Sequence, residues 1–333
     1  MKIQDDYPID NTLNLRSNAI KGAIVRSVEE LKRLVKLSGF KDHDSVALGM
    51  GSNVIPMPVV NKLVISIRIS GTAILKEDED FVWVSCGAGE NWDTFVRSLL
   101  AKGLYGLENL VLIPGLVGAA PIQNIGAYGT EVSEFVESVE VVNEAGVVSI
   151  LDNTDCEFSY RNSLFKNNSK LVVTAVCFKL RKKARVRIDY PDLTDFFAAL
   201  NKRNPTPLEI ADAVTQIRTQ KLPDPEKHPN VGSFFKNPLV NEKKAGQLQA
   251  RYPMLKTYRS KNGIKLSAAQ LIDLEGWKER PSATVACWKN QPLVLVNQNQ
   301  GTVTDLLGFA EDIARSIEHR YDVSLELEPS ILS

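Results

Sequence analysis

The sequence is poor in the residues that build metal centres and disulfide frameworks. Its 333 residues include only four cysteines and three histidines, and all of them are scattered along the chain. Cys86, Cys156, Cys177 and Cys287 form no CxxC pair. Neither a zinc site nor a disulfide scaffold is expected, so no metal is predicted and each cysteine is better explained as a small buried apolar residue.

The chain also lacks an excess of charge and any long hydrophobic run. Forty basic residues balance forty acidic ones without a basic track, so nucleic acid is not an expected partner. The most apolar stretch, residues 110–121, is broken by Pro114, Gly115 and Gly118, which excludes a membrane span. The first ten residues do not resemble a secretory signal. We expect a cytoplasmic monomer of ordinary globular composition.

Helical and strand patterns are both present, without strict alternation and without internal repeats. This mixture predicts an α+β fold. Apolar residues at helical spacing predict helices, and runs rich in β-branched and aromatic residues predict strands. One helix is expected to begin at Ser27, and two more are expected at 91–102 and 304–319. The expected strands cover 62–67, 81–86, 136–143, 171–180 and 323–327. The proline-rich stretch 221–225 indicates a connector.

A short loop after a strand-like segment has the composition of a phosphate-binding turn. It reads Gly49-Met50-Gly51-Ser52-Asn53. Two glycines let successive backbone N–H groups turn inward, and such a concavity binds phosphate oxygens without a charged side chain. The motif is not followed directly by a helix, which argues against a Rossmann domain. Alone this motif is a weak signal, because most glycine-containing turns beside a strand bind no ligand.

A second segment, residues 106–129, is more informative; we call it the glycine-rich segment. Its glycines and alanines remove side-chain bulk along one path, so that backbone can lie against a planar ring or a diphosphate. Gln123, Asn124 and Tyr128 place polar groups in an otherwise apolar run. Without a ligand, such a run is expected to leave much backbone polarity unpaired.

These motifs resemble one known family. GLENL, IPG and GAAPIQNIGAYG in the glycine-rich segment, GMGSN at 49–53 and CGAGENW at 86–92 are similar to sequences of the UDP-N-acetylenolpyruvoylglucosamine reductases, type I branch. The resemblance implies a vanillyl-alcohol-oxidase-type FAD-binding fold and an α+β substrate domain. It implies FAD contacts at Gly49, Gly51, Ser52, Asn53, Pro114, Gly115, Gly118, Ala119, Ala120, Gln123, Asn124, Gly126, Ala127 and Tyr128.

The resemblance extends to the reacting residues. Ser159-Tyr160-Arg161-Asn162-Ser163 is similar to the family block whose arginine faces the substrate carboxylate, where a guanidinium would stabilise developing charge. Gly232-Ser233-Phe234-Phe235 is similar to a second family block. In the family, the serine of this block protonates C2 of the substrate's enolpyruvyl group after the flavin has delivered hydride to C3. Phe234 and Phe235 are expected to be packing residues.

The resemblance also implies substrate contacts and a domain plan. Tyr190, Lys221, Asn237 and Gln291 correspond to family substrate positions. NADPH is the implied hydride donor and a UDP-linked enolpyruvyl sugar the implied substrate. The expected division is FAD-binding subdomains at 1–70 and 71–220, a substrate domain at 221–320 and a returning strand at 321–333.

The C-terminus departs from the family pattern. The chain reads Leu327-Glu328-Pro329-Ser330 where the family has a catalytic glutamate after Glu-Pro, so Ser330 stands at the catalytic position. A serine cannot supply a carboxylate's charge. Three readings therefore remain: the reductase itself, a divergent paralogue acting on another enol ether or unsaturated carboxylate, and a flavin-binding protein without turnover. Glu328 is a candidate substitute for the missing acid.

Overall fold

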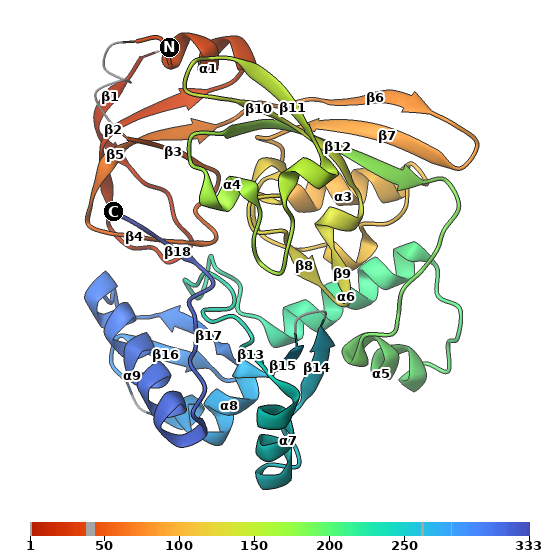
Figure 1. Ribbon diagram of the computed structural model, residues 1–333, viewed down its shortest axis with the longest axis vertical. Coiled ribbons are helices and arrows are strands. Elements are labelled where there is room, and N and C mark those ends of the chain that lie inside the picture. Colours follow the sequence, from red (N-terminus) through yellow and green to blue (C-terminus); the bar gives the residue numbers. More distant parts are fainter. Residues whose placement is uncertain (1, 38–43, 261–262, 281) are drawn as a thin grey trace. The chain divides into compact units, whose positions relative to one another are not determined.

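The computed structural model describes residues 2–37, 44–260, 263–280 and 282–333 (Figure 1). The chain divides into two compact units. The first comprises Met1–Pro8, Asn18–Met50 and Val60–Arg218, and the second comprises Ile9–Ser17, Gly51–Val59 and Thr219–Ser333. Two short N-terminal segments thus belong with the C-terminal residues. The four-part division expected from the sequence stays a prediction.

One sheet of the first unit is built mainly from the N-terminal strands. Its order is β1 (Gln4–Pro8), β2 (Asn18–Val25), β5 (Val59–Ile67) and β3 (Ser45–Leu48). β1 runs antiparallel to β2, whereas β3 runs parallel to β5. Leu63, Val64 and Ile65 of β5 are fully buried, as expected for a central strand rich in β-branched residues. Helix α1 (Val28–Leu34) begins at the Ser27 cap, whose side chain accepts from the N–H of Glu30.

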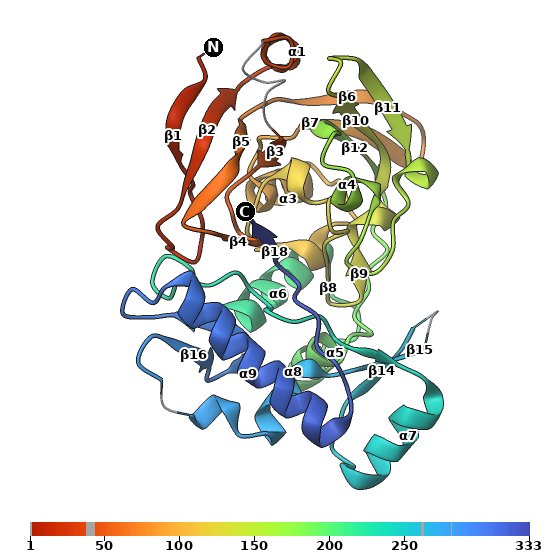
Figure 2. The same ribbon diagram turned by 60° about the vertical axis from the view of Figure 1, so that its left-hand side comes forward.

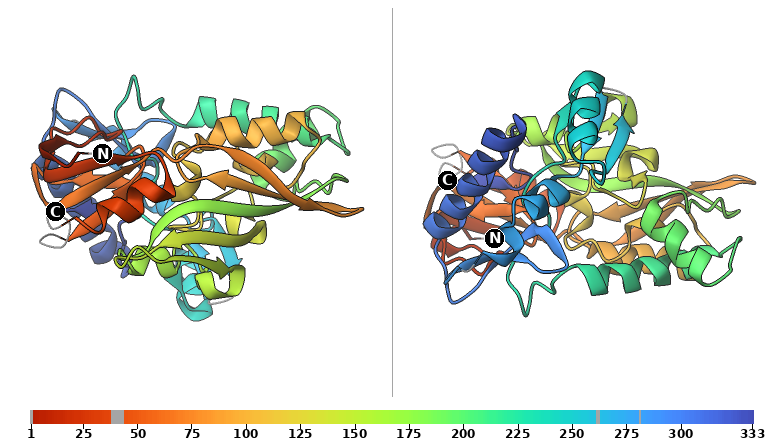
Figure 3. Two further views of the ribbon diagram at one scale, coloured as in Figure 1. Left: turned by 90° about the horizontal axis from the view of Figure 1, so that it is seen from above. Right: turned by 90° about the horizontal axis from the view of Figure 1, so that it is seen from below.

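The second sheet of this unit is antiparallel throughout. Its order is β11 (Val148–Asp152), β10 (Val136–Val142), β12 (Val172–Arg181), β7 (Phe81–Gly87) and β6 (Thr72–Glu77), and β6 and β7 form a long hairpin (Figure 3). Helix α3 (Trp92–Ala101) packs on β12, since the rings of Trp92 and Phe95 lie 6.0 and 5.3 Å from that of Phe178. Asn91 caps this helix by accepting from the N–H of Thr94.

The rest of the first unit consists of two short strands, several helices and irregular segments. It contains the two-residue strands β8 (Gly126–Ala127) and β9 (Thr130–Glu131) and the helices α4 (Leu164–Asn167), α5 (Pro191–Ala199) and α6 (Pro207–Lys221). Helices α3 and α6 lie side by side (Figure 3). Arg97 of α3 donates from Nη2 to the hydroxyl of Thr215 on α6 at 2.9 Å. Helix α3 also contacts residues 108–110 of the glycine-rich segment.

The second unit has its own core around small sheets. These are β13 (Leu239–Val240), β15 (Gly263–Leu266) and β14 (Thr257–Ser260), the hairpin of β16 (Val285–Trp288) and β17 (Gln291–Asn297), and the parallel pair β18 (Ser330–Leu332) and β4 (Val54–Pro56). Helices α8 (Ala268–Leu274) and α9 (Val303–Tyr321) pack against the hairpin, and α7 (Glu242–Arg251) contacts β15 (Figure 2).

The predicted α+β class is confirmed, and most expected elements are present at close to their expected bounds. The final strand was placed wrongly. Within residues 323–327 only Leu327 forms a bridge, to Phe235, and the regular strand is β18. Pro329 has no N–H, so pairing is interrupted there and resumes at Ser330 with a different partner strand.

Candidate functional site

In the first unit, the glycine-rich segment is joined by backbone hydrogen bonds to the CGAGENW stretch. The N–H of Gly118 donates to the carbonyl of Ala88, and that of Val117 donates to Glu90, both at 2.9 Å. The N–H of Trp92 donates to the carbonyl of Gly115 at 3.1 Å. Two motifs that are separate in the sequence therefore lie side by side in the first unit.

Glycine is required where these two stretches meet. A Cβ at Gly118 would lie 2.5 Å from the Cβ of Ala88 and 3.0 Å from its backbone. Gly115 has φ +136°, a conformation that side chains disfavour. The small residues thus allow close packing of backbone on backbone.

The expectation that this run leaves much of its polarity unpaired was wrong for several groups. Tight turns satisfy them internally: the N–H groups of Ala119, Ala120 and Ile122 donate to the carbonyls of Leu116, Val117 and Ala119. Ile125 donates likewise to Ala120 at 3.1 Å. A ligand is therefore not needed to satisfy these groups, and the segment's suitability for one depends on its shape and on the groups around it.

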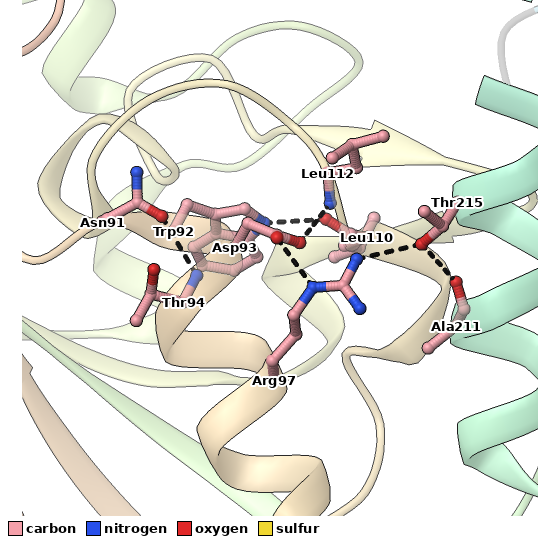
Figure 4. Close-up of polar contacts among 9 residues, drawn as sticks. All are labelled: Asn91, Trp92, Asp93, Thr94, Arg97, Leu110, Leu112, Ala211 and Thr215. Carbon is pink, nitrogen blue, oxygen red and sulfur yellow. Dashed lines mark hydrogen bonds and ion pairs between the residues drawn. The ribbon is translucent and has the colours of Figure 1, made fainter. Parts of the chain in front are cut away.

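A hydrogen-bond network at the start of α3 holds residues 110–112 of the glycine-rich segment (Figure 4). Asp93 accepts from the N–H of Leu112 at 2.6 Å through Oδ1 and from Nε of Arg97 at 2.7 Å through Oδ2. Leu112 is held at φ +59°, an unusual conformation for a leucine. The indole of Trp92 donates to the carbonyl of Leu110 at 2.8 Å. The loop before Pro114 is thereby held in one strained shape.

Asn124 and Tyr128 also have positive φ, 47° and 49°. The Asn124 side chain is 1% exposed; it donates to Glu131 and to the carbonyl of Ser159 and accepts from Ser133. Its side chain therefore shapes the loop. The ring of Tyr128 lies 5.4 Å from that of Tyr190 in an edge-to-face pair, and burial raises the pKa of Tyr128 to about 12.

Arg161 lies against the glycine-rich segment. Its Nη2 donates to the carbonyl of Gly126 at 3.1 Å, and a Cβ at Gly126 would come within 3.3 Å of Nη1. Arg161 has φ +54° in a tight turn closed by mutual backbone hydrogen bonds between Ser159 and Asn162. Ser163 then caps α4 and donates to Ile122 at 2.6 Å. The structure thus brings Arg161 and Gly126 together, as two of the predicted site residues.

In the second unit, the part of the GMGSN loop that begins at Gly51 packs on the segment after β1. A Cβ at Gly51, which has φ +65°, would lie 2.2 Å from the carbonyl oxygen of Asp10 and 2.7 Å from Cα of Asn11. Thr12 donates from its N–H to the carbonyl of Gly51 at 3.4 Å. The Thr12 hydroxyl is buried and has no hydrogen-bond partner within the described ranges. An unsatisfied hydroxyl beside this loop is what a site for an absent polar ligand leaves.

Ser233 sits in an extended segment held on both sides within the second unit. It forms a bridge with Val294 of β17. On the other side the carbonyl of Phe234 accepts from the N–H of Glu328 at 3.0 Å. Phe234 and Phe235 are 0% and 1% exposed, so their expected packing role fits their burial. Asn230, 3% exposed, accepts from Gly232 and so fixes the turn before the serine.

The other predicted residues of this unit lie on regular elements. Lys221 ends α6, and Gln291 begins β17 opposite Trp288. Asn237 accepts through Oδ1 from the N–H of Ala268 at 3.0 Å, at the start of α8. The N–H of Ser330 donates to the carbonyl of Asn53 in the GMGSN loop at 3.1 Å.

Glu328 and Ser330 differ in exposure. Glu328 is 9% exposed, whereas Ser330 is exposed to solvent. The two side chains therefore occupy different surroundings, although they are two residues apart.

Comparison with known proteins decides the family. Residues 22–152 match the family model described as an FAD binding domain, and residues 224–332 match the C-terminal domain of UDP-N-acetylenolpyruvoylglucosamine reductase. The Flavobacterium johnsoniae protein of that name is 37% identical over 339 residues, covering 100% of both chains. The Polynucleobacter asymbioticus protein is 41% identical over 325 residues, covering 97% of this chain and 94% of its own. The chain belongs to the UDP-N-acetylenolpyruvoylglucosamine reductase family.

A solved structure shows the same fold. UDP-N-acetylenolpyruvylglucosamine reductase from Thermus caldophilus superposes with a TM-score of 0.65 at 24% identity, covering 100% of this chain and 98% of its own. The expected fold, a flavoprotein FAD-binding domain with an α+β C-terminal domain, is confirmed. Within the described residues, no helix is long and apolar enough to cross a membrane, and no three His, Cys, Asp or Glu side chains gather to hold a metal ion.

Two observations on the residues of this reductase-family chain fit the binding of FAD. A Cβ at Gly118 or Gly51 would collide with neighbouring protein atoms, so glycine fixes the backbone path of both motifs. The buried Thr12 hydroxyl beside the GMGSN loop has no partner in the described part of the chain. Sequence reasoning missed Thr12 and Asp93, because a lone threonine and a first-turn aspartate carry no motif signal.

Proposed function

We propose that this chain catalyses the NADPH-dependent reduction of UDP-N-acetylglucosamine enolpyruvate to UDP-N-acetylmuramate, with FAD as bound cofactor. The observation that carries the proposal is similarity over the full length, at 37% and 41% identity, to proteins named for this reaction. Bound FAD would supply the hydride chemistry between NADPH and substrate. A cytoplasmic location and a monomeric state stay predictions.

The chain's own residues would divide the work in the following way. Arg161, held by the Gly126 carbonyl, would pair with the substrate carboxylate and stabilise charge as it develops there. Ser233 would give its hydroxyl proton to the substrate carbon next to that carboxylate. Tyr190, Lys221, Asn237 and Gln291 are proposed to hold the substrate. The fourteen residues of the GMGSN loop and the glycine-rich segment that the family resemblance implies as FAD contacts are proposed to bind FAD.

A second candidate is a divergent paralogue that reduces another enol ether or unsaturated carboxylate. The specific observation favouring it is Ser330, an exposed serine at the family's catalytic glutamate position. A flavin-binding protein without turnover is the third reading.

One anaerobic experiment separates these readings. The bound flavin is reduced by NADPH, excess NADPH is removed, and substrate is added while flavin absorbance is followed. Recovery of the oxidised spectrum with the UDP-linked enolpyruvyl sugar supports the proposal. Recovery only with small enolpyruvyl analogues supports the paralogue, and recovery with neither contradicts both.

A further inference from the structure

Asn230 is a buried asparagine whose side chain binds the turn that carries Ser233. It is 3% exposed. Its Oδ1 accepts from the N–H of Gly232, the residue before the serine, at 2.8 Å. Its Nδ2 donates to the carbonyls of His228 at 2.8 Å and Pro223 at 3.3 Å. A buried amide that uses both its acceptor and its donor group in this way is held in one orientation.

The backbone around Asn230 is anchored as well. The N–H of Asn230 donates to the carbonyl of Thr12 at 2.9 Å, and the carbonyl of Pro229 accepts from the N–H of Asn297 at 2.8 Å. All of these residues belong to the second unit. Asn230 therefore has a fixed position from which its side chain can hold the turn.

Side-chain packing does not fix the turn at Gly232. This residue has φ +75°, which residues with a Cβ disfavour. A Cβ built on it would meet no atom of the described residues within 4 Å, its chain neighbours aside. After the serine, the N–H of Phe234 donates to the carbonyl of Leu293 at 2.8 Å. Before the serine, the hydrogen bond from Gly232 to Asn230 is what holds the backbone.

We infer that Asn230 is a positioning residue for proton transfer from Ser233. The inference rests on the proposed function, in which the serine O–H bond breaks as a bond forms between that hydrogen and the substrate carbon next to the carboxylate. The serine oxygen then regains a proton from solvent. A misplacement of about 1 Å can slow such a step by about 100-fold. Asn230 limits this error by acting on Ser233 through the N–H of Gly232.

The test uses full-length protein with bound FAD. Asn230→Ala removes every hydrogen bond of the side chain, whereas Asn230→Asp keeps an oxygen that can accept from Gly232 and loses only the Nδ2 donors. Asn297→Ala is the matched control. Asn297 is a second buried asparagine of this unit, 5% exposed, and its Nδ2 donates to the carbonyl of Leu13. Stopped flow measures each half-reaction, and urea unfolding measures stability in parallel.

Asn230→Ala is expected to slow the substrate half-reaction by about 10- to 100-fold. Reduction of the flavin by NADPH should be unchanged, because it does not use the serine proton. Asn230→Asp should be slowed less, although it also loses stability with the Nδ2 donors. Asn297→Ala should keep the wild-type rates. If Asn230→Ala does not fold, Asn230→Ser replaces it, since a serine hydroxyl makes the same turn more weakly.

A double variant separates positioning from general support of the fold. Once Ser233→Ala has removed the hydroxyl, adding Asn230→Ala should slow the substrate half-reaction no further, because no proton is left to position. A further loss in that background would overturn the inference. So would a wild-type rate in Asn230→Ala, an equal loss in Asn230→Asp, or an equal loss in Asn297→Ala.

Failure of the proposed function gives a different result. In that case the reduced flavin of the wild-type protein would not be reoxidised by the UDP-linked enolpyruvyl sugar, and the inference would fail with the proposal. An active wild type with contrary results in the variants would overturn the inference alone.

Discussion

Several single residues in or beside the glycine-rich segment hold unusual backbone conformations. Arg161, Leu112, Asn124 and Tyr128 all adopt positive φ, and each lies in or against the glycine-rich segment. Such conformations persist only where surrounding contacts enforce them, and they concentrate at ligand sites. The sequence motifs identified Arg161, Asn124 and Tyr128 as site residues, but they gave no sign of the contacts that hold this region, such as the hydrogen bond from Leu112 to Asp93.

Replacement of Ser233 by alanine tests the proposed proton donor. Loss of a positioned acid is expected to lower kcat by about 10²–10⁴-fold. The KM for the enolpyruvyl substrate and the NADPH reduction rate of bound flavin should change little, because neither involves that proton. Stopped-flow measurement of the two half-reactions separates them. An unchanged rate of substrate reduction would remove Ser233 from the mechanism.

Arg161→Lys keeps the positive charge but loses the two-pronged geometry held by the Gly126 carbonyl. We expect the substrate half-reaction to slow by about 10²–10³-fold, comparable to the loss of one preorganised stabilising donor. FAD content should stay at the wild-type level. A rate within a few-fold of the wild type would show that charge alone is sufficient.

Glu108 offers a pH test of stability at the start of the glycine-rich segment. It is 2% exposed, accepts from the N–H of Gly106 at 2.6 Å, and burial raises the pKa of its carboxyl. The folded state therefore holds this proton more tightly than the unfolded state, so stability declines as pH rises through the raised pKa.

Glu108→Gln keeps the acceptor and cannot titrate. Thermal unfolding should show the variant at least as stable as the wild type at neutral pH, with its advantage shrinking toward pH 4. A variant that loses stability equally at all pH values would contradict this reading.

At the scale of elements, the periodicity of apolar residues predicted those helices and strands whose bounds are set by local sequence. Helices α3 and α9 and strands β7, β10 and β12 follow their expected bounds closely, because their apolar patterns and caps are local. The placement of β18 was missed, because its partner β4 lies almost the whole chain away and no local signal encodes that pairing.

Gly118→Ala tests the contact between the two glycine motifs. The added methyl would meet Ala88 at 2.5 Å, so we expect a destabilisation of about 1–3 kcal/mol and weaker FAD binding. Gly308→Ala in α9 is the control, since a Cβ there meets nothing within 4 Å. That change should stabilise by about 0.5–1 kcal/mol. Equal behaviour of the two variants in urea unfolding would argue against a close contact at Gly118.

Strand β18 begins at Ser330, the residue that we expect at the family's catalytic glutamate position. If the standard chemistry is latent, Ser330→Glu should raise turnover by about tenfold or more, as a restored acid would. Glu328→Gln should lower turnover if Glu328 substitutes for the missing group. Ser330→Gln controls for size. If Ser330→Glu does not raise turnover, the chain is not a weakened form of the standard reductase. Unchanged turnover in Glu328→Gln would rule out that Glu328 takes the place of the missing glutamate.

At the scale of the whole molecule, two units share a discontinuous chain. Ile9–Ser17 and Gly51–Val59 cluster with residues 219–333, so the GMGSN loop is divided at Met50. The proline-rich stretch 221–225 indicated a connector, but nothing in the sequence indicated that the two N-terminal segments pack with the C-terminal residues. Packing between segments that are distant in the chain produces no periodic pattern in the sequence. The family and its cofactor class followed from the motifs, since backbone surfaces for a planar ligand need small residues at fixed places.

The most direct test of the account is the cofactor content of the purified full-length protein. We predict a yellow protein with an oxidised flavin spectrum and about one FAD per chain, released on denaturation and regained on reconstitution. A colourless protein that takes up no FAD when titrated would contradict the account, because the surface formed by the glycine-rich segment would then have no flavin to bind.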